Sequence, residues 1–420
     1  MSNVQKAIII GAGPAGLAAA LQLHRNNNIA TTVYELRPEP TTLGGAIGIF
    51  SNGMRLFHRL GLAEALLARG SSINHMQLHS LQSGDLGKVD ISSWAQQKTG
   101  FGYLRICRKD LQEVLFDAIN EQQIPVHFNK RIVSVNESPK DVTVTFSDGS
   151  TDTADILIGC DGIHSSVRRL HVDPSIVPEY SGIAGTQSII PSAGLPDAMK
   201  TQGNVFMTSN GILAIMPCSP TGDELYWFFS RETAIPHSES GHARDGWEER
   251  RQQEVDGYKD TVLKVFGSSG GEWSDTLTKA MDRTDFVGFY PIFRLPLGGK
   301  WFTSRTVLLG DAAHAMQPHA GQGTSMALED VFLLSRLLRD QEWSLESVFA
   351  RYEEIRRPRV TEIYNLAAKN GNKRKNTSPW GLWMKEYMAW AAYGLYNKLG
   401  LESWGIGQNH LVYDIDEVTI

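Results

Sequence analysis

Cysteine is scarce in this chain of 420 residues, which contains only Cys107, Cys160 and Cys218. None of the three stands in CxxC spacing, and both disulfide frameworks and cysteine metal sites need closer or more numerous thiols. We therefore expect no metal ion, no disulfide framework and a reducing, cytoplasmic compartment.

Long apolar runs and an excess of positive charge are also missing. No stretch reaches the roughly 18 apolar residues typical of a transmembrane helix, so we expect no transmembrane segment. The N-terminal apolar run breaks at glycines, and no convincing signal-peptide cleavage site follows it. The net charge is −6 and no Lys/Arg-rich face is evident, which argues against nucleic acid as a partner.

An aromatic stretch near the C-terminus, "WGLWMKEYMAWAAYGLY" over residues 380–396, comes nearest to a membrane segment, but Lys385 and Glu386 interrupt it. Four aromatic residues fall near helical spacing: Trp380, Trp383, Tyr387 and Trp390. The pattern favours packing of this face on the protein body. Contact with a partner, such as a second copy in a homodimer, and contact with a membrane surface stay open.

Small residues are abundant at the N-terminus, in "IIIGAGPAGLAAA" over residues 8–20. Gly11, Gly13 and Gly16 fit G-x-G-x-x-G between an expected strand (8–10) and an expected helix (16–25). A second expected strand (31–35) ends at Glu35. In such a βαβ start the glycines allow a tight turn, the approach of a pyrophosphate and close helix packing, while the acid binds a ribose. The pattern predicts dinucleotide binding, for which NAD and FAD both fit.

Two later segments combine an acid with glycine. "IGCDGIHSSVRR" over residues 158–169 places Asp161 and Gly162 at the end of an expected strand, followed by Ser165 and Arg168. Alone, it fits an ordinary turn with a capping acid. "GDAAHAMQPHAGQG" opens with Gly310 and Asp311, which end the strand-then-glycine segment "TVLLGD" over residues 306–311. Two glycine-rich segments so far apart in the sequence suggest that both approach one large ligand.

These three motifs, in this order, resemble the flavoprotein aromatic hydroxylases, the single-component FAD monooxygenases of the para-hydroxybenzoate and salicylate hydroxylase type. The resemblance covers roughly residues 4–359 and includes "ICRKDLQEVL" around Arg108 and "YEEIRRPR" over 352–359. Cys160, where alanine is frequent, and Ser304, where glycine is common, depart from the family pattern.

The resemblance implies the site residues. It places the FAD-binding positions at Gly11, Gly13, Ala15, Gly16, Glu35, Arg37, Gly45, Arg108, Asp161, Gly162, Arg168, Gly310, Asp311, Gly321, Gln322 and Gly323. Pro318, Gly321 and Gly323 are the expected catalytic positions, because they shape the oxygen-reacting face and the helix start at the flavin. His314 and His319 are interpreted as structural, and Glu329 and Asp330 as packing or capping residues. A simple surface pair remains the alternative for Arg108.

The implied reaction consumes NADPH or NADH, reduces FAD and inserts one atom of O2 into an aromatic or other electron-rich substrate through a flavin C4a-hydroperoxide. No second G-x-G-x-x-G follows a strand, so no separate nicotinamide domain is expected. Halogenases carry a WxWxIP signature that is absent here. An FAD-dependent epoxidase or rearranging oxygenase remains an alternative, as does a redox-inert FAD-binding protein.

The expected fold is α/β. A Rossmann-like FAD-binding domain (1–75, 101–180 and 295–365) is interleaved with an antiparallel substrate-binding sheet domain (76–100 and 181–294), and a C-terminal helical segment (366–420) follows. A helix over 110–122 with Asp110 as its N-cap, a hairpin from 142 and a helical insert over 246–266 are expected within it. Candidate substrate-pocket positions lie at 204–216, 226–230 and 289–293.

Overall fold

A parallel sheet forms the first half of the molecule. The computed structural model describes residues 4–42, 44–236, 243–266, 273–340 and 342–420. The sheet has the order β18 (Thr306–Leu308), β12 (Ile156–Gly159), β1 (Lys6–Ile10), β2 (Ala30–Tyr34) and β8 (Val126–His127), with every junction parallel. Its central strands are buried and rich in isoleucine, as expected for strands covered on both faces.

Helices surround this sheet and connect its strands. They include α1 (Pro14–Asn27), α5 (Arg108–Glu121), the short α10 (Asp311–His314), α11 (Gly323–Leu337) and α12 (Leu345–Asn372). Helix α1 packs against both α5 and α11. The expected βαβ start is confirmed. The expected N-cap at Asp110 is wrong, because α5 begins two residues earlier and places Asp110 in its first turn.

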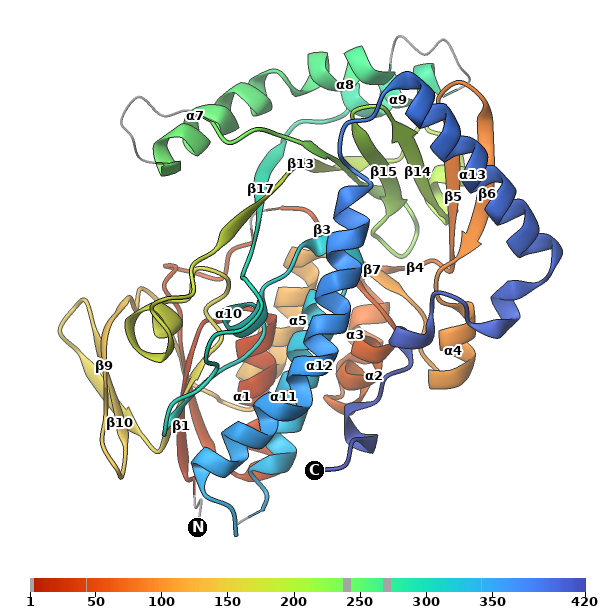
Figure 1. Cartoon of the computed structure of the whole chain (residues 1–420). Helices are drawn as coiled ribbons and strands as arrows, with labels where there is room; N and C mark the ends of the chain where they lie inside the picture. The colour runs from red at the N-terminus through yellow and green to blue at the C-terminus, as the bar shows by residue number, and fades with distance from the viewer. Residues whose placement is uncertain (1–3, 43, 237–242, 267–272, 341) are drawn as a thin grey trace.

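A seven-stranded sheet forms the second half (Figure 1). Its order is β17 (Gly288–Arg294), β13 (Glu179–Pro191), β16 (Glu224–Glu232), β15 (Gly211–Pro217), β14 (Gly203–Thr208), β5 (His75–Ser80) and β6 (Gly84–Asp90). The junction between β14 and β5 is parallel and the others are antiparallel. Strands β5 and β6 enter this sheet from the N-terminal third of the chain, so no short hairpin imposes an antiparallel junction between β5 and β14.

The two faces of the seven-stranded sheet bury different clusters. Side chains that include Phe206, Trp227 and Phe229 pack with α8 (Tyr258–Phe266) and α9 (Ser274–Asp282). The alternating positions, among them Met216 and Tyr226, pack against β3 (Ala46–Ile49) and β7 (Leu104–Cys107) of the first half. The strand period of two thus divides the expected pocket ranges between a helix-covered face and a face turned to the parallel-sheet half.

Smaller elements complete the fold. Strands β3, β7 and β4 (Ser71–Ser72) make a three-stranded sheet, and β9 (Ile132–Glu137), β10 (Val142–Phe146) and β11 (Thr151–Ala154) make another. The remaining helices are α2 (Ser51–Arg59), α3 (Ala63–Leu67), α4 (Ser93–Thr99), α6 (Ala198–Thr201) and α7 (Ala243–Asp256). The expected hairpin is confirmed as β10–β11, and the expected helical insert as α7 and α8.

The aromatic stretch near the C-terminus forms α13 (Pro379–Lys398), which lies beside β6 (Figure 1). The expectation that its aromatic face packs on the body is wrong, because Trp380, Trp383, Tyr387 and Trp390 are each more than half exposed. The opposite face makes the contact instead, with Glu386 buried and Tyr393 against Gly87. No helix among the described residues is long and apolar enough to cross a membrane.

Candidate cofactor and substrate site

The glycines of the first motif occupy different environments. A Cβ atom on Gly11 would lie 2.5 Å from the carbonyl oxygen of Cys160, and one on Gly16 would lie 1.9 Å from the carbonyl oxygen of Gly11. Both therefore permit close packing between β1, α1 and β12. Gly13 has no atom within 4 Å of its Cβ position and caps the N-terminus of α1. Open space beside a helix N-terminus suits a pyrophosphate.

Glu35 follows β2, and its side chain binds the glycine-rich turn between β1 and α1. Its Oε2 accepts a hydrogen bond from the backbone N–H of Ala12 at 2.8 Å, and its Oε1 accepts one from the N–H of Arg37 at 2.9 Å. A carboxylate keeps further lone pairs for a ribose hydroxyl. The guanidinium of Arg37 instead donates to the carbonyl oxygen of Thr41 at 2.6 Å, on the exposed side of this loop.

The second motif is tied to the third by Arg168. Asp161 accepts hydrogen bonds from the N–H groups of Ser166 and Val167 at 2.6 and 3.2 Å. The Arg168 guanidinium is buried and donates to the carbonyl oxygens of Ile163 and Ala312 at 2.5 and 2.7 Å. Its position indicates that it joins the two motif loops through their backbones. Gly162 has a positive φ of 75° and open space at its Cβ position.

The third motif lies directly against the first. A Cβ atom on Gly310 would lie 3.5 Å from Cβ of Ala15 and 3.0 Å from Cβ of Ala327 on α11. The side chain of Asp311 is exposed, yet protein atoms around it raise its pKa by desolvation, while His314 and Arg108 lower it. Arg108 is exposed at the start of α5, and its backbone N–H donates to the carbonyl oxygen of Gly45 at 3.1 Å.

The segment before α11 offers a second helix N-terminus. Pro318 is exposed, and a Cβ atom on Gly321 would lie 2.8 Å from the ring of Phe50. Gly323, the first residue of α11, has open space at its Cβ position. Gln322 is buried; its Oε1 accepts from Asn52 at 2.9 Å, while its Nε2 has no partner among the described residues.

A buried network of ion pairs between α11 and α12 supports the segment before α11. The Arg356 guanidinium on α12 contacts Glu329 and Asp330 of α11, each at 2.7 Å. Asp330 also accepts from the backbone N–H of Gly310 at 2.8 Å and contacts Nε2 of His314 at 2.7 Å. Glu329 accepts from Asn52 at 2.8 Å, the same amide that binds Gln322. His314, Glu329 and Asp330 therefore have structural contacts, while burial lowers the pKa of His319 to about 2.

The residues present fit an FAD molecule. Open space at Gly13 and Gly323 marks two helix N-termini, which suit a pyrophosphate and the electron-rich edge of a flavin ring. The unpartnered amide of Gln322 supplies a buried donor beside the second of these. Gly310, packed on Ala15, brings the two segments together.

Sequence reasoning missed three polar or aromatic side chains that face this region: Tyr103 directly before β7, Arg105 on β7 and Gln187 on β13. They meet Tyr226, which lies in the expected pocket range 226–230. The alternation within "YLRIC" places Tyr103 and Arg105 on one face of β7, but nothing local indicates that this face meets Tyr226, more than a hundred residues later.

Two cysteines unexpectedly meet next to these residues. The sulfur atoms of Cys107 and Cys218 lie 3.7 Å apart, and a carboxylate oxygen of Glu224 lies 3.9 Å from Cys107. The three side chains are arranged as potential metal ligands, although the contact with Cys107 and burial raise the pKa of the Cys218 thiol, an effect that the cation Arg105 opposes. Spacing in the sequence gave no sign of this cluster, because long-range strand packing creates it.

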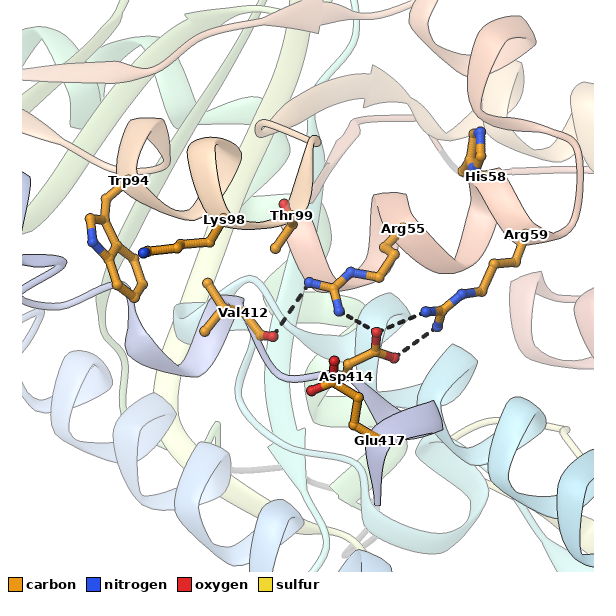
Figure 2. Close-up of a pocket in the computed structure, with 9 residues that line it drawn as sticks. All are labelled: Arg55, His58, Arg59, Trp94, Lys98, Thr99, Val412, Asp414 and Glu417. Carbon is orange, nitrogen blue, oxygen red and sulfur yellow. Dashed lines mark hydrogen bonds and ion pairs between the residues drawn. The ribbon is translucent and has the colours of Figure 1, made fainter. Parts of the chain in front are cut away.

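A cavity of about 550 Å³ lies elsewhere, between α2, α4 and the C-terminal segment (Figure 2). Arg55 and Arg59 extend into it and bind Asp414, at 2.5 and 2.7 Å. None of the predicted site residues lines it. Both of its arginines already have a carboxylate partner, and we infer that the cofactor binds at the motif loops rather than in this cavity.

Comparison with known proteins agrees with the motif geometry. A family profile described as "FAD binding domain" matches residues 4–270 and 297–367. The chain is 30% identical over 387 residues to 6-hydroxynicotinate 3-monooxygenase of Pseudomonas fluorescens, covering 90% of this chain and 94% of that protein. This chain belongs to the single-component FAD-dependent aromatic hydroxylases. The enzyme is also 28% identical to 3-amino-4-hydroxybenzoate 2-monooxygenase of Streptomyces platensis, with 89% of each chain covered.

Solved structures support the fold. The structure of Klebsiella pneumoniae HpxO complexed with FAD and uric acid matches with a TM-score of 0.79 at 24% identity, covering 96% of the hydroxylase described here and 97% of HpxO. This likeness confirms the expected fold class, while the family match and the curated relatives confirm the FAD-dependent monooxygenase activity. The individual site residues stay predictions.

Proposed function

We propose that this hydroxylase uses NADH or NADPH and O2 to place one hydroxyl group on an aromatic ring that carries a carboxylate. The observation that carries the proposal is the contact of Gly310 with Ala15 of the first motif, together with the contact of Gly321 with Phe50. Phe50 leads to a wall of tyrosine and arginine side chains. The relatives named for 6-hydroxynicotinate and 3-amino-4-hydroxybenzoate support this class of substrate.

Bound FAD would supply the transfer of electrons from the nicotinamide to O2. The chain's own residues bind and orient it. Gly13 leaves room for the pyrophosphate, Glu35 and Asp311 accept hydrogen bonds from sugar and ribityl hydroxyls, and the N-terminus of α11 stabilises negative charge on the ring. Pro318 and Gly321 shape the face where the substrate meets the cofactor.

The experiment is purification of the protein, followed by its visible spectrum and a substrate panel. We expect a flavin spectrum and NAD(P)H oxidation stimulated by an aromatic acid. When ¹⁸O2 is supplied, the product should contain one atom of ¹⁸O. Use of NADH versus NADPH follows from the same assay. A protein that binds FAD but is never bleached by NAD(P)H would be a redox-inert FAD-binding protein, and the proposal would fail.

Two finer assignments stay predictions. A cytoplasmic location rests on cysteine usage; all three cysteines are free and buried. A homodimer rests on the exposed aromatic face of α13, and gel filtration with light scattering measures it.

A further inference from the structure

Arg105 is a cation without a carboxylate partner in the part of the chain that the structure describes. It lies on β7, where Leu104 and Ile106 face the core of the parallel-sheet half and Arg105 faces the other way. Its guanidinium carbon lies 5.6 Å from the centre of the Tyr103 ring and 5.3 Å from that of Tyr226. Its Nε atom is buried and has no hydrogen-bond partner. An unpaired cation in a partly buried position is costly, which favours binding of an anion.

A series of contacts places Arg105 beside the expected flavin loops. On one side Tyr103 packs on Phe50, with ring centres 4.7 Å apart, and Phe50 in turn contacts Gly321. Tyr103 also approaches Gly48 of β3, whose Cβ position lies 2.4 Å from the tyrosine hydroxyl. The wall that contains Arg105 is therefore continuous with the loop before α11.

On the other side the contacts run to the start of α5. The Tyr226 hydroxyl donates to Oε1 of Gln187, and Nε2 of Gln187 lies 2.6 Å from the Cβ position of Gly45. Gly45 accepts from the backbone N–H of Arg108. Arg105 thus lies between the loop before α11 and the start of α5, which both contain expected FAD-binding positions.

The chemistry of this wall fits a flat anion. A guanidinium matches a carboxylate in a planar, two-hydrogen-bond geometry, and the two tyrosine rings over which it lies hold it in place. Burial raises the pKa of Tyr226 to about 12, against the opposing effect of Arg105 and Arg108, so its hydroxyl stays a neutral donor at pH 7. Because Arg105 would repel a cation, the neighbouring thiols of Cys107 and Cys218 do not make this a metal site.

We propose that Arg105 binds the carboxylate of an aromatic acid substrate and thereby selects acids over uncharged rings. This assignment rests on the proposed function and adds the residue that sets its substrate class. Arg105 is a specificity residue, because it holds a part of the substrate that does not react.

The test measures equilibrium binding to the FAD-loaded enzyme through the change in flavin absorbance. The ligands are pairs with and without the carboxylate: 6-hydroxynicotinate with 2-hydroxypyridine, and 4-hydroxybenzoate with phenol. We expect the wild-type enzyme to bind at least one acid ten times more tightly than its uncharged counterpart. Arg105→Gln should abolish that preference by weakening the acid at least tenfold, with the uncharged ring changed less than twofold. Arg105→Lys should retain part of it.

Glu224→Gln is the matched control, since it removes a nearby charge that the proposal does not use, and it should leave the preference intact. Flavin content and far-UV circular dichroism show that each variant is folded. Equal binding of acids and uncharged rings by the wild type, or an undiminished preference in both Arg105 variants, would overturn the assignment. Failure of the proposed function looks different: no ring compound, charged or uncharged, would then stimulate NAD(P)H oxidation.

Discussion

At the scale of single residues, the glycines of the first motif separate folding from binding. Gly16 is required by protein packing, because its Cβ position overlaps the carbonyl oxygen of Gly11. Gly13 is required by nothing in the protein: its φ of −78° and ψ of 179° are open to any residue, and its Cβ position is free. We infer that a bound ligand is the reason for glycine at this position.

We therefore predict that Gly13→Val folds normally but loses FAD, because the valine side chain occupies the path of the pyrophosphate. Unfolding of the apoprotein in urea should match the wild type, while the flavin-to-protein ratio after desalting falls at least tenfold. Gly16→Val, the control, should fail to fold. Normal FAD content in Gly13→Val would show that the cofactor does not pass over this residue.

Asp311 is a second residue for which we expect cofactor binding and protein stability to change independently. Desolvation raises its pKa, so at pH 7 the ionised carboxylate is less favourable in the folded protein than in the unfolded chain. Asp311→Ala should weaken FAD binding by about 1–3 kcal/mol, the cost of a lost hydrogen bond. The same change should leave the apoprotein at least as stable as the wild type. Titration of apoprotein with FAD and urea unfolding measure the two effects, and a destabilised apoprotein that binds FAD normally would contradict this role.

At the scale of elements, local sequence patterns predicted the helices and strands that depend on nearby residues alone. The alternation of apolar residues and the glycine turn located β1, α1 and β2. The pairing of β5 with β14 could not be predicted, because it depends on where a distant hairpin packs. The role of Glu329 and Asp330 was likewise hidden, since their partner Arg356 lies on another helix, next to acids of its own such as Glu353.

We predict that Arg356→Met lowers the free energy of unfolding by about 3–5 kcal/mol, because it removes the cation that bridges two buried carboxylates. Among the described residues, Glu329 would keep only Arg359 at 3.5 Å as an ion-pair partner, and Asp330 only His314. FAD binding should weaken as well, since Asp330 holds Gly310 and Glu329 holds Asn52 beside Gln322. Arg356→Lys should recover part of both losses. Lys109→Met removes the exposed ion pair between Lys109 and Glu113, whose charged atoms lie 3.7 Å apart. It should change the free energy of unfolding by less than about 1 kcal/mol. Equal effects of Arg356→Met and Lys109→Met in urea unfolding would refute the network.

At the scale of the whole molecule, the end of the chain returns to the parallel-sheet half. Arg336 on α11 donates to the carbonyl oxygens of Ile415 and Val418, the latter at 3.1 Å. Arg359 on α12 donates to that of His410 at 2.6 Å. Asp414 binds Arg55 and Arg59 of α2 (Figure 2). Residues 409–420 therefore connect three helices that carry or support the expected flavin loops. Sequence patterns did not show this, because the partners lie far apart in the chain and the contacts of Arg336 and Arg359 use backbone carbonyls.

Asp414 gives this connection a defined dependence on pH. Burial raises its pKa, but the hydrogen bonds from Arg59 and Arg55 outweigh burial and hold the pKa well below its usual range. We predict that Asp414→Asn lowers the free energy of unfolding at pH 7 by about 1.5–3 kcal/mol, as expected for hydrogen bonds to a charged group. A depressed carboxyl pKa stabilises the folded state above the ordinary aspartate pKa of about 3.9 and ceases to do so as the pH falls toward the lower folded value. The difference in the free energy of unfolding between wild type and variant should therefore be constant from pH 8 to pH 5 and should shrink below pH 4.

Asp416→Asn is the control. Asp416 is more exposed and pairs with Arg59 at 2.9 Å, so this variant should show a smaller difference. A difference for Asp414→Asn that does not change between pH 7 and pH 3.5 would mean that packing, rather than the charge of Asp414, holds the C-terminal segment in place.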